Sequence, residues 1–440
     1  MTKEELKTKV ISAISLGCDK NKVDLEHMLG RLQAYGFQIT DDVYNCDIVI
    51  VNTCAFIQPA QEEAIANIIE MEDLKKQGRI EKIIVTGCFP ERNYSSMKEN
   101  FPNIDAFLKL RDNENICEKI ASLYEVEISK GAKKYSRVLT SAGGYAYLKI
   151  ADGCNNVCSY CTIPRIRGRY KSEPIEKLVD EAKGLVSNGI NEIILVAQDT
   201  TRYGEDLYGE NKLIALCEQL SKIKDLKWIR IHYAYPEKVS DELLSYIVKN
   251  DKICKYLDMP LQHIDDKILS SMRRRLNEDE TRKLIYKIKN NYPEIAIRST
   301  FIVGYPGETR DAFKKLCDFI QESKFDYAGF FPYSKEPNTA SFYMKGHLSN
   351  WIKKRRHKKI TKLQNAIVSE KVMSQIGQEM IVKVDYFDDN NGEYVCHSEK
   401  LSPLVDFGVR IVDNNSVKVN DFVKVKIYDF DGNDYKGEII

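Results

Sequence analysis

Apolar and polar positions along the first 125 residues alternate in blocks typical of repeated β/α units. Three short, mostly β-branched runs are expected to form buried strands: Val10–Leu16, Ile48–Val51 and Ile83–Val85. Amphipathic helical patterns such as Val23–Tyr35 lie between them. A series of this kind predicts an open parallel sheet covered by helices. We assign residues 1–125 to this first α/β domain.

A second β/α series follows a polar segment, residues 126–144, which ends in Gly143-Gly144 and is expected to be a linker. Six strands separated by helical patterns fit an open or partial (β/α) barrel better than a closed eight-stranded one. With a long polar helix at its end, this domain is expected to span residues 145–375. The six expected strands are Tyr147–Ala151, Glu192–Ala197, Trp228–Tyr233, Tyr256–Met259, Ala296–Val303 and Tyr327–Tyr333.

The pattern changes again in residues 376–440, where short alternating runs are separated by turns rich in Gly, Asn and Asp. This pattern predicts a third domain, a small five-stranded β-barrel of the OB type. Its clearest strands are expected at Met380–Tyr386, Glu393–His397, Val409–Val412 and Phe422–Tyr428.

Composition indicates an ordinary globular protein. Lys and Arg number 66 against 65 Asp and Glu, so the chain as a whole has no net attraction for nucleic acid. The first residues do not resemble a signal peptide, and no apolar run approaches the roughly 20 residues of a membrane span. We therefore expect a cytoplasmic protein that does not enter a membrane. In that reducing compartment the 12 cysteines favour metal ligation or burial over disulfides.

Three of these cysteines, Cys154, Cys158 and Cys161, lie within eight residues after the first strand of the second series. They are therefore expected at the carboxyl edge of the barrel, where barrel active sites lie. Three thiolates hold a [4Fe–4S] cluster with one iron left open, since four ligands are normally needed. A zinc knuckle is the alternative, but it needs a fourth ligand nearby, and the next histidine is His232. The spacing resembles that of radical S-adenosylmethionine (AdoMet) enzymes, which implies AdoMet on the open iron.

A second set consists of Cys18, Cys54 and Cys88, each at the end of a predicted strand of the first domain and spaced 36 and 34 residues apart. One βα unit takes about 30 residues or more, so successive units bring all three thiols to the same carboxyl edge of the sheet. Each cysteine alone would be interpreted as a core residue. Together they predict a second three-cysteine cluster, also with an open iron.

The other six cysteines are expected to be structural. Cys46 precedes its strand, at the wrong edge of the sheet, and Cys254 also precedes a strand. The remaining four lie in amphipathic helical patterns or in a barrel strand: Cys117, Cys217, Cys317 and Cys396.

The two cysteine sets, together with the C-terminal barrel, resemble the methylthiotransferase family over nearly the whole chain. The family inserts sulfur at an unactivated C–H bond and methylates it, and its C-terminal barrel is OB-like, of the TRAM type. One branch modifies adenosine in tRNA. The other modifies an aspartate of small-subunit ribosomal protein number twelve.

Several segments are similar to the ribosomal-protein branch: Arg230–Pro236, Pro260–His263 and Ala197–Gly204. Two segments depart from the family pattern. Pro337-Asn338 stands where Glu-Gly is usual, and Glu173 stands in place of a common Arg. Neither departure involves a cysteine of the two sets.

The resemblance implies two [4Fe–4S] clusters held by the six cysteines, AdoMet as the radical source, and attack on the β-carbon of the target aspartate. The first domain is then expected to cover the mouth of the barrel. The resemblance also implies an electron donor such as flavodoxin or ferredoxin, and a sulfur donor. Further AdoMet contacts are expected at strand ends or beside the third thiolate: Tyr160, Gln198, Gln262, Arg298 and Gly304.

Local charge gives a separate indication of the partner. The C-terminal domain has thirteen acidic residues against seven Lys or Arg. Such a surface would repel RNA and attract a basic ribosomal protein of the small subunit, which makes tRNA the less favoured substrate; the alternative is a surface that serves only solubility. The basic run Lys353–Lys359 fits a solvated helix face better than an RNA-binding patch. A non-enzymatic iron–sulfur ribosome-assembly factor remains the least favoured alternative.

Overall fold

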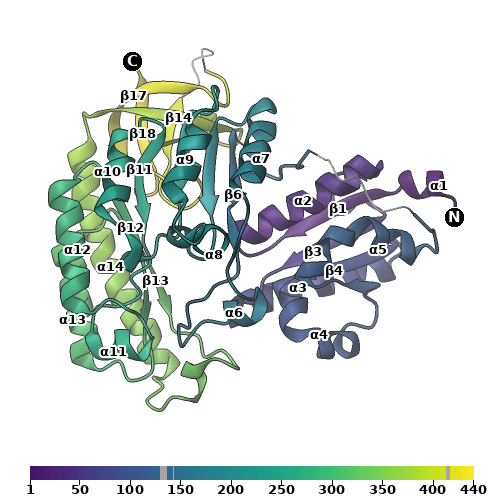
Figure 1. Cartoon of the computed structure of the whole chain (residues 1–440), viewed down its shortest axis with the longest axis horizontal. Coiled ribbons are helices and arrows are strands. Elements are labelled where there is room, and N and C mark those ends of the chain that lie inside the picture. Colours follow the sequence, from purple (N-terminus) through teal and green to yellow (C-terminus); the bar gives the residue numbers. More distant parts are fainter. Residues whose placement is uncertain (129–135, 142, 413–416) are drawn as a thin grey trace. The chain divides into compact units, whose positions relative to one another are not determined.

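The computed structural model describes residues 1–128, 136–141, 143–412 and 417–440, which form two compact units (Figure 1). Unit 1 consists of Met1–Thr140 together with Asp152–Asn156 and Cys161–Tyr170. Unit 2 consists of Ser141–Ala151, Val157–Tyr160 and Lys171–Ile440. The linker expected at 126–144 lies partly outside the described residues.

Unit 1 is built on a five-stranded parallel sheet with the order β2-β1-β3-β4-β5. The α/β fold expected for this part of the chain is confirmed. The two edge strands were not predicted, because each has only two residues. The strands are β1 (Val10–Ser15), β2 (Gln38–Ile39), β3 (Ile48–Thr53), β4 (Lys82–Gly87) and β5 (Ala106–Phe107). The helices are α1 (Lys3–Lys7), α2 (Asp19–Tyr35), α3 (Gln58–Lys76), α4 (Cys88–Asn100), η1 (Leu110–Asn115), α5 (Ile116–Leu123) and α6 (Ile163–Ile166).

The sheet of unit 1 is buried on both faces. Successive side chains of a strand point to opposite faces, so on β3 Val49 and Val51 join one hydrophobic core, and Ile48 and Ile50 join the other. Burial on both sides explains why the central strands are continuous apolar runs. The polar groups of this unit are consequently concentrated where the strands end.

Unit 2 contains an open six-stranded parallel sheet with the order β13-β12-β11-β10-β9-β6, as the six-strand pattern predicts. Its strands are β6 (Tyr145–Lys149), β9 (Glu192–Val196), β10 (Trp228–Ile231), β11 (Ile253–Asp258), β12 (Ala296–Val303) and β13 (Tyr327–Pro332). The short strands β7 (Ala151–Asp152) and β8 (Lys171–Ser172) form a separate pair. The helices are α7 (Ile175–Ser187), η2 (Thr200–Arg202), α8 (Glu205–Tyr208), α9 (Leu213–Ser221), η3 (Pro236–Lys238), α10 (Asp241–Lys249), α11 (Asp266–Ser271), α12 (Glu278–Asn291), α13 (Arg310–Ser323), η4 (Ala340–Tyr343) and α14 (Asn350–Gln375).

The start of β11 differs from the prediction. The strand begins at Ile253, so Cys254 lies inside it rather than before it. The charged residue Lys255 interrupts the apolar run, so the predicted strand began only after it. Its ammonium donates to three backbone carbonyls, including that of Asn250 at 2.8 Å, and this bonding allows a charged residue within the strand.

The C-terminal domain is a closed five-stranded barrel with the order β14-β15-β16-β18-β17, as predicted. Closure leaves no free sheet edge. Its strands are β14 (Glu379–Asp388), β15 (Glu393–Ser398), β16 (Val409–Val412), β17 (Phe422–Phe430) and β18 (Tyr435–Ile439).

Buried charges join this barrel to the six-stranded sheet within unit 2. Arg230 of β10 pairs with Glu192 of β9 at 3.0 Å, and both side chains are fully buried. His397 of the barrel lies between two carboxylates, with Nε2 2.6 Å from Glu192 and Nδ1 2.7 Å from Asp385. Burial disfavours the charged imidazole, but the two carboxylates outweigh it and raise the pKa of His397. The charges are therefore matched, as a buried network requires.

The loop between β15 and β16 makes a second connection to the sheet. The Ser402 hydroxyl lies 2.9 Å from Nε2 of His232. The Tyr256 hydroxyl donates to Asp406 at 2.7 Å, and Arg298 lies 3.5 Å from the same carboxylate. Since the side chains of Asp385 and Asp406 are buried at this junction, part of the acidic excess of the barrel serves internal pairing rather than its outer surface.

The basic run on α14 divides between the interior and the surface. Lys353 and Arg356 are buried; Lys353 donates to the Tyr333 carbonyl at 2.9 Å, and Arg356 pairs with Glu308. Lys354 and Arg355 are exposed. The helix packs against β13 and α13. The expectation of a solvated face is therefore correct for only part of the run.

Among the residues that the structure describes, no two cysteines form a disulfide bond. Across the described ranges, every helix is too short or too polar to cross a membrane.

Candidate active site

Three cysteines of unit 1 lie where neighbouring parallel strands end. Cys18 follows β1 as the N-cap of α2, Cys54 directly follows β3, and Cys88 follows β4 as the first residue of α4. The register pairs Thr53 with Gly87, so the chain positions of Cys54 and Cys88 are adjacent. The carboxyl edge of this sheet thus brings the second predicted cysteine set together.

Gly17 determines how closely two of these cysteines approach. Its φ is +93°, and a Cβ built on it would lie 2.5 Å from Cβ and 3.0 Å from Sγ of Cys54. A Cβ contact under 3.0 Å forces a neighbour to move, and the positive φ also favours glycine. The glycine therefore makes room for the Cys54 side chain beside the loop that carries Cys18.

Polar side chains link the ends of the same strands. The Asn21 amide donates to the Leu16 carbonyl at 2.8 Å and to the Thr53 carbonyl at 3.2 Å, which ties the end of β1 to that of β3. The Thr53 hydroxyl donates to the carbonyl of Thr86 at 2.6 Å, which ties β3 to β4. These bonds fix the backbone from which the thiols project.

Arg167 brings a buried positive charge to this edge. Its guanidinium pairs with Asp24 at 3.0 Å and Asp152 at 2.8 Å, and it donates to the Asn21 side chain at 3.2 Å. It also interacts with the thiol of Cys88. Arg167 follows Cys161 by six residues, so the segment after the CxxxCxxC loop contributes to the surroundings of the other cysteine set.

The electrostatics of these thiols suit a cationic ligand. Burial raises the pKa of Cys88 to about 12, although Arg167 opposes this shift, and burial also raises the pKa of Cys54. A thiol of this kind loses its proton to solvent when it becomes a metal ligand, and the positive charge of the metal then stabilises the buried thiolate. Cys18 and Cys88 begin helices, whose N-terminal dipoles stabilise negative sulfur.

The CxxxCxxC loop runs between the units: Cys154 and Cys161 belong to unit 1 and Cys158 to unit 2. Backbone amides point at two of its sulfurs, with Asn156 N 3.4 Å from Cys154 Sγ and Ile163 N 3.4 Å from Cys161 Sγ. Amides in this orientation stabilise thiolates.

Cys158 has two further polar neighbours in unit 2. Its sulfur lies 3.0 Å from the Tyr235 hydroxyl and 3.9 Å from a guanidinium nitrogen of Arg274. The guanidinium also lies 4.1 Å from the centre of the Tyr235 ring. Cys158 and Tyr235 are buried, and Arg274 is half-buried. Hydrogen-bond donors and positive charge around a cluster sulfur control its reduction potential.

The donor sets fit iron–sulfur clusters better than single ions. Within the part of the chain that the structure describes, no three His, Cys, Asp or Glu side chains are grouped closely enough for one metal ion. Thiolates on a zinc ion each lie about 2.3 Å from it, so they must crowd together. In a cluster each thiolate binds a different iron, so they stand further apart. The three thiols at the ends of β1, β3 and β4, with the space that Gly17 leaves beside Cys54, are ligands of the kind that such a cluster binds.

The weaker AdoMet candidates lie in different settings. Tyr160 packs in an apolar group with Met272, Tyr305 and Tyr333. Gln198 lies two residues beyond β9. Gln262 follows β11 at φ +73° and is held by a bridge to Phe301.

The last two candidates, Arg298 and Gly304, lie against charged side chains of unit 2. Arg298 is the third residue of β12 rather than at its end, and its guanidinium pairs with Asp258 at 3.0 Å as well as with Asp406. Gly304 does follow β12, but a Cβ there would meet the Lys353 side chain at 2.6 Å. Lys353 of α14 fills the space that this glycine leaves.

Four residues around the cysteines were not singled out from the sequence: Asn21, Arg167, Tyr235 and Arg274. Asn21 lies three residues after Cys18, and Arg167 lies six residues after Cys161. Their closeness in sequence to these cysteines could have identified them. Tyr235 belongs to the Arg230–Pro236 segment that distinguished the family branch. Arg274 lies far from any cysteine in sequence, and only the fold brings it to Cys158.

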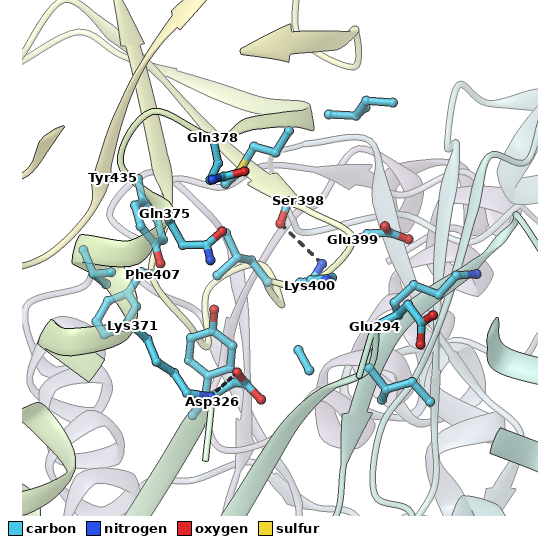
Figure 2. Close-up of a pocket in the computed structure, with 18 of the residues that line it drawn as sticks. Glu294, Asp326, Lys371, Gln375, Gln378, Ser398, Glu399, Lys400, Phe407 and Tyr435 are labelled. Carbon is cyan, nitrogen blue, oxygen red and sulfur yellow. Dashed lines mark hydrogen bonds and ion pairs between the residues drawn. The ribbon is translucent and has the colours of Figure 1, made fainter. Parts of the chain in front are cut away.

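A cavity of about 900 Å³ opens at the other end of the six-stranded sheet (Figure 2). Its lining includes Trp228, Ala296 and Tyr327, the first residues of β10, β12 and β13. Lys371 and Asp326 form an ion pair on its wall. The lining contains none of the candidate cysteines, so the cavity is separate from the site described above.

Three family models match consecutive parts of the chain. Residues 10–109 match uncharacterized protein family UPF0004, residues 148–320 the radical SAM superfamily (SAM being AdoMet), and residues 376–440 the TRAM domain. These ranges contain the strand-end cysteines, the CxxxCxxC loop and the closed barrel, respectively.

A solved structure shares the fold. TsrM, a radical S-adenosylmethionine methyltransferase from Kitasatospora setae solved with cobalamin and a [4Fe-4S] cluster bound, is 15% identical with a TM-score of 0.56, over 76% of this chain and 77% of that chain.

Curated relatives are much closer in sequence. The ribosomal protein uS12 methylthiotransferase RimO of Desulforamulus reducens is 43% identical over 95% of this chain and 96% of its own length. The protein of the same name from Citrifermentans bemidjiense is 42% identical over 99% of both chains. Since relatives this similar match nearly end to end, the chain belongs to the RimO family of ribosomal protein uS12 methylthiotransferases.

Proposed function

We propose that this chain attaches a methylthio group to the β-carbon of an aspartate in ribosomal protein uS12. The chain is a radical AdoMet methylthiotransferase by family, and that family uses AdoMet and [4Fe–4S] clusters. When bound, these cofactors supply a radical able to abstract a C–H hydrogen, the sulfur atom and the methyl group.

The observation that carries the proposal is the convergence of Cys18, Cys54 and Cys88 at one sheet edge. A radical AdoMet enzyme needs only the CxxxCxxC loop to generate its radical. A second set of three thiols, at the ends of three strands, provides for a further cluster, and sulfur insertion is the reaction that needs one.

The protein's own residues have distinct tasks in this proposal. Cys154, Cys158 and Cys161 hold the cluster that binds AdoMet, and Cys18, Cys54 and Cys88 hold the second cluster. Arg167 offsets negative charge beside the second set. Tyr160, Met272, Tyr305 and Tyr333 form an apolar wall beside the loop that keeps water away from reactive species.

The reaction requires partners that are not part of this chain. An electron donor such as flavodoxin or ferredoxin must reduce the first cluster, and a sulfur donor must restore the sulfur consumed in each turnover. The target, uS12, belongs to the ribosome, so we place the reaction in the cytoplasm.

A tRNA methylthiotransferase is the alternative function. The ion pairs of Asp385 with His397 and of Asp406 with Arg298 weaken the electrostatic argument against RNA, because these two buried carboxylates do not contribute to the outer surface of the barrel. The names of the relatives support uS12 instead.

The test offers reconstituted enzyme uS12 and unmodified tRNA side by side, with AdoMet, sulfide and a reductant. We expect uS12 to gain the mass of one methylthio group in place of hydrogen, on an aspartate, and tRNA to remain unchanged. Modification of tRNA alone would overturn the proposed substrate. Cleavage of AdoMet without modification of either would overturn the methylthiotransferase activity.

A further inference from the structure

The segment that joins β13 to α14 and continues into that helix has an unusual charge. Residues 331–362 contain nine Lys or Arg and a single acidic residue, in a chain whose total charge is +1. The acidic residue, Glu336, is buried. Lys353 and Arg356 are also buried, so the other cations determine the charge of the surface.

The exposed cations follow one face of α14. Lys354 and Lys358 are four residues apart, and Arg355 lies beside them. No ion-pair partner stands within 4.0 Å of these three side chains among the described residues. In α12, by contrast, Lys283 pairs with Asp279 and Arg282 with Glu278. Like charges four residues apart destabilise a helix, so the stripe on α14 weakens the helix that carries it.

Large aromatic side chains are exposed among these cations. Tyr343 is 74% exposed and Trp351 66% exposed. The guanidinium of Arg355 lies 4.6 Å from the centre of the Trp351 ring, so the ring and the cation form a cation–π contact at the surface. We call the surface formed by Tyr343, Lys345, Trp351, Lys354, Arg355 and Lys358 the basic rim.

The basic rim lies beside the CxxxCxxC loop. The amide of Ser341, in η4, donates to the carbonyl of Ser159 inside that loop at 2.8 Å. The first turn of α14 fills the space next to Gly304, directly after β12. Figure 1 shows the segment between β13 and α14, in lime green, at the end of the sheet where β13 stops. A macromolecule bound to the rim is therefore held next to the carboxyl edge of the sheet.

We propose that the basic rim binds RNA next to the target protein, so that the substrate is uS12 within a small-subunit ribosomal particle rather than free uS12. This inference rests on the proposed function. Unpaired cations bind phosphates, and exposed aromatic rings stack on unpaired bases. Ribosomal proteins are themselves basic, so charge complementarity assigns this surface to the RNA that surrounds the target.

The test compares two substrates, free uS12 and small ribosomal subunits that contain unmodified uS12. The first variant is the triple substitution Lys354→Ala, Arg355→Ala and Lys358→Ala, and the second is Trp351→Ala. The matched control is Lys222→Ala, Lys224→Ala and Lys227→Ala, which removes three exposed lysines before β10, at the opposite edge of the sheet. Kinetics on both substrates and binding to the subunits at two salt concentrations are measured.

We expect both rim variants to raise KM on the subunits by roughly tenfold or more and to leave KM on free uS12 unchanged. The triple variant should also lower the slope of log affinity against log salt by roughly two. The control should change neither. Equal losses on both substrates would assign the rim to uS12 itself, and unchanged kinetics on the subunits would remove its role; either result overturns the inference.

The outcome for the proposed function is read separately. Wild-type enzyme that modifies neither substrate contradicts the proposed function. Wild-type enzyme that modifies free uS12 but not subunits upholds that function and overturns the inference about the particle.

Discussion

The hydroxyl of Tyr235 lies 3.0 Å from the sulfur of Cys158, the middle cysteine of the CxxxCxxC loop. A phenol is protonated at neutral pH, whereas a cluster ligand is a thiolate, so in the loaded enzyme the hydroxyl is the donor. Tyr235 comes from the end of β10, and Arg230 and His232 of the same segment contact the C-terminal barrel. One short segment thus connects the barrel junction to the first cluster.

Removing this donor should change the reduction potential of the first cluster. In Tyr235→Phe we expect a more negative midpoint potential, because a hydrogen bond to sulfur favours the reduced, more negative cluster. Iron content should stay the same. Redox titration followed by electron paramagnetic resonance measures the midpoint potential, and iron analysis measures the iron content. Tyr203→Phe is the control, since it removes a buried hydroxyl that donates to the Glu173 carbonyl at 2.7 Å. An unchanged potential in Tyr235→Phe would contradict the role.

Gly17→Ala should remove the second cluster and spare the first. The added Cβ would lie 2.5 Å from Cβ of Cys54, so the thiol must move. The control is Gly78→Ala, because Gly78 has a similar φ of +73° with nothing within 4 Å of its added Cβ. Both variants have backbone strain of about 1–3 kcal/mol, and only the first displaces a thiol. Iron and sulfide analysis after reconstitution should show about half the wild-type content in Gly17→Ala, whereas full content would disprove this account of the glycine.

The buried carboxyl of Asp406 should make stability depend on pH. Burial raises its pKa to about 6, although Arg298 opposes the shift. The folded protein then holds this proton more tightly than the unfolded chain, so the free energy of unfolding falls as pH rises through the folded pKa. From about pH 5 to about pH 7 the wild type should lose about 1 kcal/mol relative to Asp406→Asn, which lacks this titration. Chemical unfolding of the two apoproteins across this range measures the difference, and parallel curves would count against the shifted pKa.

Much of the fold was predictable because it depends on local pattern. The strands around Cys18, Cys54 and Cys88 are continuous apolar runs, and parallel topology alone places their ends at one edge. The edge strands β2 and β5 were missed, because two residues give no period. The side chains that surround each cysteine were harder to predict from the sequence, because Tyr235 and Arg274 reach Cys158 only through the tertiary fold.

Charge was the least predictable feature. The sequence shows how many acidic residues the C-terminal barrel has, but not that Asp385 pairs with His397 or Asp406 with Arg298. Arg298 was expected to contact AdoMet from a strand end, and its ion pairs with Asp258 and Asp406 could not be identified from the sequence. The basic run on α14 divides at single residues, because Lys353 and Arg356 face the sheet whereas Lys354 and Arg355 face solvent. The net charge of a segment does not distinguish its buried charged residues from its exposed ones.

The most direct test of the two-cluster account replaces Cys54 by Ala and measures two reactions in one reconstituted sample, AdoMet cleavage and methylthiolation of uS12. Cys46→Ala is the matched control, because Cys46 is a buried cysteine of the same unit that lies before β3 rather than after it. The account predicts that Cys54→Ala still cleaves AdoMet, with about half of the wild-type iron, but adds no methylthio group, while Cys46→Ala retains both reactions. Methylthiolation that survives in Cys54→Ala, or AdoMet cleavage that disappears with it, would contradict the separate role of the strand-end cysteines.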